Sequence, residues 1–341
     1  MRYLVRWESF FEYLRAKNTE RMKKLKKIFR DCKLPISMTL GAIIYFVFRA
    51  LPLPAEVRQC AFVAVSRWIQ PILLFLMLFL SFIKVKPSEL RPHRWHLRVL
   101  GEQALWFVVF SLLAMLASNE GVKVLCEGAM LAFICPTATA SAVITSKLGG
   151  STSGVVTYLL LCNLMVSLLA PLFLTLVEPH AELSFLTSLF MIMGKVFPLL
   201  LSPLIIAWVV RYLLPGFHRW LLKFPDLAFN IWFVSLALAI TVTVRSIMHS
   251  NVSYWYLIGL AIVSCVCCLV QFWRGRTIGD KFGHEAAVTA GQAFGQKNTV
   301  FIIWLGLVFL NPVTSVVGGF YSVWHNTVNS WQLYKVRKHD S

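Results

Sequence analysis

The chain has 341 residues, of which 58% are hydrophobic and 14% charged, and it carries a formal net charge of +18. Its hydrophobic residues fall in long blocks, which is typical of a membrane protein and leaves little sequence for a soluble domain. The Lys and Arg residues gather before and between these blocks, so the positive charge does not indicate a nucleic-acid partner.

Residues 1–34 form a basic extension. It combines aromatic and aliphatic side chains at helical spacing with eleven Lys and Arg residues. This pattern predicts an amphipathic helix lying on an anionic membrane surface, and a solvated basic tail is the alternative. Because charged residues fill the segment ahead of the first apolar block, it does not have the form of a signal peptide, and we expect no cleavage.

After this extension the sequence predicts ten membrane-spanning helices. A hydrocarbon core of about 30 Å needs about 20 mostly apolar residues per helix, and the chain has ten such blocks. A short interfacial stretch near residues 182–195 is expected before the sixth helix, with Lys195 at the membrane surface. The predicted spans are residues 35–53, 62–84, 98–118, 123–147, 153–177, 196–213, 224–247, 253–272, 282–309 and 312–333.

The basic residues between the spans lie in alternate connections, for example Arg91 and Arg94 after the second span and Arg274 and Arg276 after the eighth. By the positive-inside rule, these connections and both termini face the cytoplasm. The sequence therefore predicts a multi-pass protein of the cell's inner (plasma) membrane, in contact with the lipid bilayer.

Polar residues and glycines interrupt two of the spans, at residues 136–141 in the fourth and 289–298 in the ninth. Each interrupted span is the fourth in a set of five, which predicts an inverted five-plus-five repeat with discontinuous helices. Unpaired backbone in lipid costs several kcal/mol, so such breaks need cover from protein or from a watery cavity. Two helices kinked for packing are the alternative. The predicted units are residues 35–177 and 178–333, with a cytoplasmic tail at 334–341.

Little in the sequence indicates an enzyme or a resident cofactor. The eight cysteines are scattered, mostly inside apolar blocks, and their spacing suggests neither disulfides nor a metal site. No pair of metal ligands at helical spacing, nucleophile motif or phosphate-binding glycine loop is visible. The chain is therefore predicted to be neither an enzyme nor a metalloprotein.

Several motifs resemble those of the bile acid:sodium symporter family, and the resemblance runs through the chain after residue 35. Residues 135–141 (Cys-Pro-Thr-Ala-Thr-Ala-Ser) are similar to the fourth-helix motif of the family, and Gln103 falls where its third helix carries a glutamine. Residues 78–90 resemble the end of its second helix. The most specific string is Ser-Val-Trp-His-Asn at residues 322–326, which is similar to the tenth-helix motif.

The resemblance implies a panel domain built from helices one, two, six and seven, and a core domain built from the other six. Helices four and nine would cross within the core. Substrate would bind between the two domains, and their rocking would give alternating access. The resemblance also implies a small organic anion as cargo, of the bile acid, steroid sulfate or keto acid type.

The chain departs from the family at the residues that would hold sodium. Alignment on Asn298 places Ala293 where the family has a glutamate that serves two sodium ions, and Lys297 where it has a glutamine. Ala142 replaces an expected asparagine. An ammonium has no lone pair to give to a cation and repels it. Sodium is thus left as a doubtful ligand, and we hypothesise that Lys297, paired with Glu102, replaces it with a tethered cation.

Other interpretations stay open for the polar residues within the spans. Lys297 could instead extend to water, and Glu102 could be an interfacial charge. Glu127 and Glu285 are interpreted as interfacial charges, with a role as proton carriers as the alternative. His325 is interpreted as a structural residue, with a pH-sensing role as the alternative. The candidate residues for a substrate or ion site are Glu102, Gln103, Thr139, Ser141, Asn163, Gln296, Lys297, Asn298, His325 and Asn326.

The sequence as a whole predicts a secondary transporter of a small organic anion. One alternative is a membrane-embedded sensor or partner subunit on the same scaffold, for which the basic extension would report occupancy. Another is an arsenite exporter, because Cys135 lies beside Pro136 in the fourth span. The substrate itself, the direction of transport, the coupling ion and the oligomeric state are not specified by the sequence.

Overall fold

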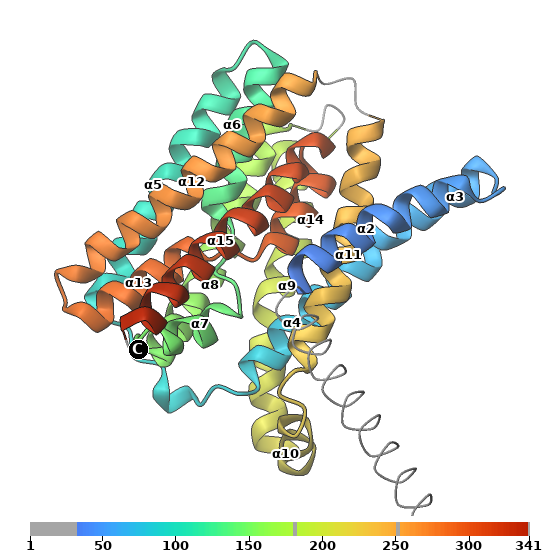
Figure 1. Cartoon of the computed structure of the whole chain (residues 1–341). Coiled ribbons are helices and arrows are strands. Elements are labelled where there is room, and N and C mark those ends of the chain that lie inside the picture. Colours follow the sequence, from blue (N-terminus) through green and yellow to red (C-terminus); the bar gives the residue numbers. More distant parts are fainter. Residues whose placement is uncertain (1–32, 180–182, 250–252, 340–341) are drawn as a thin grey trace, which may run out of the picture.

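The computed structural model describes residues 33–179, 183–249 and 253–339, and every regular element in these ranges is a helix (Figure 1). The predicted all-α fold is confirmed for this part of the chain. The predicted amphipathic extension at residues 1–34 lies almost entirely outside the described residues. The helices of the first half are α2 (Lys33–Ala50), α3 (Ala55–Ala64), η1 (Val65–Ile69), α4 (Gln70–Phe82), η2 (Pro87–Glu89), α5 (Arg94–Leu116), α6 (Glu120–Ile134), α7 (Ser141–Lys147) and α8 (Thr152–Val177).

The second half repeats this use of long apolar helices. Its elements are α9 (Phe185–Leu213), α10 (Pro215–Leu222), α11 (Leu227–Met248), α12 (Tyr254–Asp280), α13 (His284–Gly295), α14 (Thr299–Phe309), η3 (Pro312–Ser315) and α15 (Val316–His339). Because α15 continues to His339, the predicted tail at 334–341 is largely an extension of the last helix.

Six helices in the described ranges are long and apolar enough to cross a membrane. They are Ala55–Phe82, Arg94–Leu116, Thr152–Val177, Phe185–Leu213, Leu227–Met248 and Tyr254–Asp280. The first of these joins α3, η1 and α4 into one rod. The π-helical turn η1 sits just before Pro71, whose missing N–H cannot complete the regular α-helical ladder. The fold thus fits a polytopic membrane protein, while the count of ten spans stays a prediction.

The interfacial stretch expected at residues 182–195 is wrong, because α9 is one continuous helix from Phe185 to Leu213. The side chain of Ser184 accepts a hydrogen bond from the Thr187 N–H and so fixes the start of the helix. The apolar residues that follow continue the same helix through Pro198 and Pro203. Lys195 lies within this helix, where its side chain is exposed and its ammonium lies 5.5 Å from the ring centre of Phe309.

The helices pack as two groups. In the first, α11 contacts α2 and α4, and α4 contacts α9. In the second, α12 contacts α6, α13 and α15, and α5 contacts α6 and α8. Close approach of α12 to α13 depends on glycine, because a Cβ built on Gly279 would lie 2.3 Å from the carbonyl oxygen of Ala286. The contact of α8 with α9 joins the two groups.

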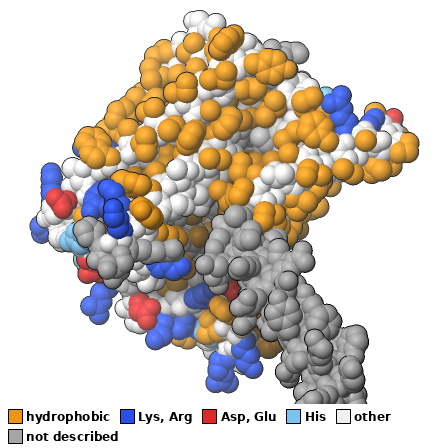
Figure 2. Space-filling view, in the orientation of Figure 1, with side chains coloured by type: hydrophobic (Ala, Val, Ile, Leu, Met, Phe, Trp, Pro, Cys, Tyr) orange, Lys and Arg blue, Asp and Glu red, His pale blue; other side chains and the backbone are white. Residues whose placement is uncertain are grey.

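Apolar side chains cover much of the outer surface of the bundle. Leu105 and Leu112 on α5 and Ile258 and Ile262 on α12 are exposed although they are large and apolar. Figure 2 shows such side chains across most of the upper part of the molecule, whereas Lys and Arg gather mainly toward its lower end. An apolar belt with basic residues beyond it is what a lipid bilayer requires of a spanning protein.

Candidate functional site

Two helices of the second group are interrupted in the interior of the protein, and the two interruptions lie side by side. Residues 135–140 separate α6 from α7, and residues 296–298 separate α13 from α14. The N–H of Ala138 donates to the carbonyl of Gln296 (3.0 Å), and the N–H of Asn298 donates to the carbonyl of Pro136 (2.9 Å). Thr137 and Lys297 thereby form an antiparallel bridge. We call residues 135–140 and 296–298 the paired breaks; each supplies backbone partners that the other lacks.

Gln103 supports the end of α6 at the paired breaks. It is fully buried on α5, and its amide nitrogen lies 3.3 Å from the carbonyl oxygens of both Ile134 and Cys135. Its own oxygen accepts a hydrogen bond from the hydroxyl of Tyr158 at 2.6 Å. The last carbonyls of a helix have no partner within it, so a buried helix end needs such a donor. Gln103 therefore acts here as a cap.

Two of the other helix ends at the paired breaks also have side-chain partners. The Tyr321 hydroxyl donates to the carbonyl of Gly295 at 2.9 Å, at the end of α13. The side-chain oxygen of Asn298 accepts a hydrogen bond from the N–H of Phe301 at 3.3 Å, at the start of α14. The thiol of Cys135 donates to the carbonyl of Asn298 at 3.0 Å. Through these contacts the paired breaks form a polar island, that is, a cluster of backbone polar groups whose hydrogen-bond partners are side chains of the surrounding helices.

Lys297 lies in the middle of this island with no exposed surface. Its ammonium nitrogen is 3.4 Å from the carbonyl oxygen of Phe133 and 5.0 Å from the ring centre of Phe294. Among the described residues no carboxylate lies within 4.0 Å of it. The side chain does not extend to water, so the alternative interpretation of Lys297 is wrong, and a fully buried lysine side chain lies at the paired breaks.

The expected pairing of Lys297 with Glu102 is also wrong. The carboxylate of Glu102 forms two hydrogen bonds with Arg274 of α12, at 2.7 and 2.9 Å, and accepts a third from the Trp106 indole at 3.3 Å. Neighbouring residues on a helix point about 100° apart, so Gln103 can face the paired breaks while Glu102 faces α12. The planar fork of an arginine also matches a carboxylate better than an ammonium does.

The remaining candidates divide into those that join the paired breaks and those that do not. Ser141 begins α7 and donates to the carbonyl of Ala138 at 2.6 Å, and the Gln296 amide donates to that of Gln292. The ring of His325 accepts from the N–H of Lys297 at 3.4 Å. Thr139, also in the paired breaks, is half-buried.

Asn163 and Asn326 lie apart from this cluster. The Asn163 amide donates to the carbonyl of Leu200 on α9 at 3.5 Å, which links α8 to the first helix group. The Asn326 amide donates to the carbonyl of Ser322 within its own helix at 2.7 Å. Their hydrogen bonds therefore stabilise the helix framework.

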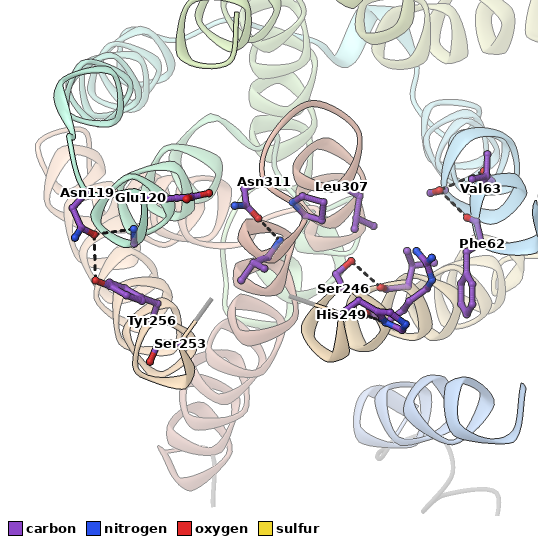
Figure 3. Close-up of a pocket in the computed structure, with 16 residues that line it drawn as sticks. Phe62, Val63, Asn119, Glu120, Ser246, His249, Ser253, Tyr256, Leu307 and Asn311 are labelled. Atoms are coloured by element: carbon purple, nitrogen blue, oxygen red, sulfur yellow. Dashed lines mark hydrogen bonds between the residues drawn. The ribbon is translucent and has the colours of Figure 1, made fainter. Parts of the chain in front are cut away.

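A cavity of about 780 Å³, which we call the vestibule, opens between the two helix groups where α6 begins and α11 ends (Figure 3). Phe62, Arg245 and His249 line it from the first group. Glu120 and Asn311 line it from the second, together with Tyr256, whose hydroxyl donates to the Asn119 side chain at 3.2 Å. The Arg245 guanidinium lies 4.7 Å from the Phe62 ring centre and donates to the Gln59 side chain. This size suits a small organic molecule.

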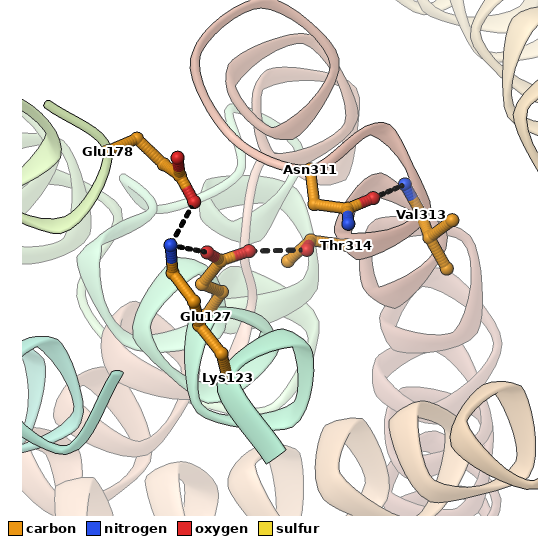
Figure 4. A network of polar contacts seen from close by, with 6 residues as sticks. All are labelled: Lys123, Glu127, Glu178, Asn311, Val313 and Thr314. Carbon is orange, nitrogen blue, oxygen red and sulfur yellow. Dashed lines mark hydrogen bonds and ion pairs between the residues drawn. The ribbon is translucent and has the colours of Figure 1, made fainter. Parts of the chain in front are cut away.

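A polar network beside the vestibule was not expected from the sequence (Figure 4). Glu127 of α6 has no exposed surface, so its interpretation as an interfacial charge is wrong. One of its oxygens accepts a hydrogen bond from the Thr314 hydroxyl at 2.7 Å, and the other lies 4.0 Å from the Lys123 ammonium. Lys123 also forms an ion pair with Glu178. The spacing of Lys123 and Glu127, four residues apart on one helix, is the sequence signal for their contact. Glu178 and Thr314, the other two residues of the network, are distant in the sequence and carry no such signal.

No protein-family model matches the chain, and no curated protein matches it. The likeness of its motifs to the bile acid:sodium symporter family therefore stays a prediction. The paired breaks, the vestibule and the buried Lys297 are the observations on which a function can be built.

Proposed function

We propose that the chain is a secondary transporter of a small organic anion that works by alternating access. The observation that carries this proposal is the meeting of two helix breaks in the interior of an apolar helical bundle. Backbone left out of helices is costly in a membrane, and proteins keep it where a substrate or ion path needs polar groups at the centre of the bilayer. An ordinary structural bundle has no need of such an arrangement.

The order of the helices supports an inverted repeat as part of the proposal. The first five spans would be α2, α3 to α4, α5, α6 to α7, and α8. The second five would be α9, α11, α12, α13 to α14, and α15. The broken helix is fourth in each set. The group of α2, α4, α9 and α11 then corresponds to the panel, and the other group to the core.

The vestibule supports alternating access between these two groups. Its walls come from both of them, so a rotation of one group against the other would narrow or close it. The sequence-based topology predicts that this end of the bundle faces away from the cytoplasm. A solute would then enter the vestibule, and closure would carry it toward the opposite face.

The charges in the vestibule favour an anion as substrate. Arg245 is half-buried in its wall and is paired with an uncharged glutamine side chain, so its positive charge is available to a ligand. Glu120, the acidic residue in the lining, is exposed at the rim. The aromatic ring of Phe62 beside Arg245 offers an apolar surface to the body of an organic anion.

The residues at the paired breaks do not fit a sodium ion, which is why sodium-independent transport is part of the proposal. The side chain of Ala293 has no ligand atom, its backbone carbonyl accepts a hydrogen bond from the Thr137 hydroxyl, and the Lys297 ammonium occupies the interior beside the Phe133 carbonyl. A sodium ion there would meet a fixed positive charge within a medium of low dielectric constant. Lys297 would supply the charge without a bound metal.

Uptake into proteoliposomes that contain the purified full chain tests the proposal. Radiolabelled bile acids, steroid sulfates and keto acids would be compared with protein-free liposomes. We expect accumulation of at least one anion, and we expect Arg245→Gln to raise its KM by about tenfold or more, because a hydrogen bond to a charged group contributes about 1.5–3 kcal/mol. Arg219→Gln, at an exposed residue outside the vestibule, is the matched control.

Failure to transport any of these anions would overturn the proposal. Stabilisation of the protein by an anion without any flux would instead indicate the sensor or partner-subunit alternative. The arsenite alternative receives no support from the site, since the Cys135 thiol is fully buried and donates its hydrogen bond to Asn298. Cys135→Ala is expected to leave arsenite tolerance of the host cells unchanged.

A further inference from the structure

The network around Glu127 contains more negative than positive charge. Two carboxylates, those of Glu127 and Glu178, share the single ammonium of Lys123. Lys123 and Glu178 have partly exposed side chains, 27% and 35%, whereas that of Glu127 has no exposed surface. The ammonium contacts Glu178 directly and lies at the limit of ion-pair distance from Glu127. The buried carboxylate is thus the one that receives less compensation.

One oxygen of Glu127 has no hydrogen-bond partner among the described residues. Its other oxygen accepts from Thr314. A buried carboxylate oxygen without a donor is costly, and two carboxylates beside one ammonium disfavour the state in which both are ionised. A proton on this oxygen would remove the excess charge. It would also leave the Thr314 hydrogen bond in place.

The elements packed against this part of α6 add no further charge. Within the described residues, α5 from Val108 to Leu116, all of α14 and all of η3 carry no Asp, Glu, Lys, Arg or His. The half of α12 nearest the vestibule contributes Tyr256, which is bound to Asn119, and cysteines at 265, 267 and 268. The first turns of α15 contribute Tyr321, which caps α13. Lys123 and Glu178 are therefore the charged partners that decide the state of Glu127.

We propose that Glu127 is a proton-binding site that is reached through Lys123 and Glu178, and that its proton is exchanged during transport. The first part concerns the site itself, and the second rests on the transport function proposed above. Lys123 and Glu178 form the path because both are partly exposed, Glu178 contacts Lys123, and Lys123 in turn lies 4.0 Å from Glu127 (Figure 4). The proton is the ligand that fits, since a metal cation here would lie beside the Lys123 ammonium.

The hydrogen bond to Thr314 connects this site to the moving parts of the transporter. Thr314 lies in η3, and its neighbours Asn311 and Val313 line the vestibule. Through α14, η3 is joined to the paired breaks. A hydrogen bond to a charged carboxylate is roughly twice as strong as one to a neutral acid. Protonation of Glu127 would therefore loosen η3 at the vestibule wall, and loss of the proton would tighten it.

Infrared difference spectroscopy of the purified full chain tests the proton site without any need for a substrate. Acidification should produce the carbonyl band of a protonated carboxylic acid in a dry environment, which Glu127→Gln should abolish. Glu285→Gln, at an exposed acid in the first turn of α13, should leave the band unchanged. Thr314→Val, which retains the carboxyl group but removes its donor, should shift the band to a different frequency. A band that survives in Glu127→Gln, or that does not respond to Thr314→Val, would overturn the site.

Transport measurements test the coupling separately. With an anion that the chain transports, an inward gradient of about one pH unit should raise accumulation by up to about tenfold if one proton moves with each solute. In Glu127→Gln, uptake should no longer respond to the gradient. Uptake in the unsubstituted protein that ignores the gradient would overturn the coupling and leave the transporter function standing. If no anion is transported, the proposed function fails, and the infrared result still decides the proton site.

Discussion

Replacement of Lys297 by methionine is expected to make the protein more stable, although it removes the cation at the paired breaks. The ammonium is fully buried, and among the described residues it has no carboxylate within 4.0 Å. Methionine has a similar length and keeps the apolar contacts of the lysine stem. The antiparallel bridge of residue 297 with Thr137 uses the backbone and is unaffected.

The size of the effect follows from the contacts that would be lost. A hydrogen bond of 3.4 Å to the Phe133 carbonyl is long and contributes at most about 1 kcal/mol. The interaction with the Phe294 ring at 5.0 Å contributes about 0.5–2 kcal/mol. Burying an ammonium costs several kcal/mol even after the protein relaxes. The free energy of unfolding should therefore rise by about 1–3 kcal/mol in Lys297→Met.

Thermal unfolding in detergent measures this change, as an expected rise of about 1–4 °C in the unfolding temperature for a chain of this size. Lys281→Met is the matched control, because that lysine is exposed just after the end of α12, and its change should stay within about 0.5 kcal/mol. Lys297→Met should also lose transport, since the fixed cation is gone. A variant that is less stable than the unsubstituted protein by 1 kcal/mol or more would refute the reasoning, because the ammonium would then have a strong partner.

Three further experiments test the packing that holds the site. Gly279→Ala places a Cβ 2.3 Å from a carbonyl oxygen of α13 and should lower the free energy of unfolding by about 1–3 kcal/mol. Gly101→Ala is the control: a Cβ there meets nothing within 4 Å, so the change should be neutral or stabilising by up to about 1 kcal/mol. Gln103→Ala removes the cap of α6 and should cost about 2–4 kcal/mol, and a cost near zero in chemical denaturation would show that the cap is dispensable. A double-mutant cycle of Glu102→Gln and Arg274→Gln should give a coupling energy of about 1 kcal/mol, as expected for a partly exposed ion pair, and no coupling would contradict the bidentate contact.

The positions of the helix breaks could be predicted because polar residues and glycines interrupt otherwise apolar segments. The break predicted at residues 136–141 lies at 135–140 in the structure. In the ninth span, the polar stretch 289–298 stays helical through Gly295, and only residues 296–298 lie outside the helices. The polar side chains of this helix find partners within the protein, as Gln292 does with Gln332 and Gln296. Composition alone cannot tell such a satisfied polar helix from a break.

The partners of the buried charges could not be predicted, since they come from distant parts of the chain. Glu102 pairs with Arg274, 172 residues away, and Glu127 binds Thr314, 187 residues away. In a single sequence nothing distinguishes these partners from other basic or polar residues. The position of Glu127 near the end of its predicted span favours an interfacial charge, not a buried one. Its burial depends on how η3 and α12 fold over α6.

Uptake of the anion in the complete absence of sodium is the measurement that tests the central claim most directly. Proteoliposomes would be prepared and assayed in potassium or choline salts, and then compared with the same vesicles in sodium. A fixed ammonium at the paired breaks predicts equal initial rates in the two conditions. A strict requirement for sodium would contradict the account, because transport would then depend on a metal ion that the Lys297 ammonium is proposed to replace.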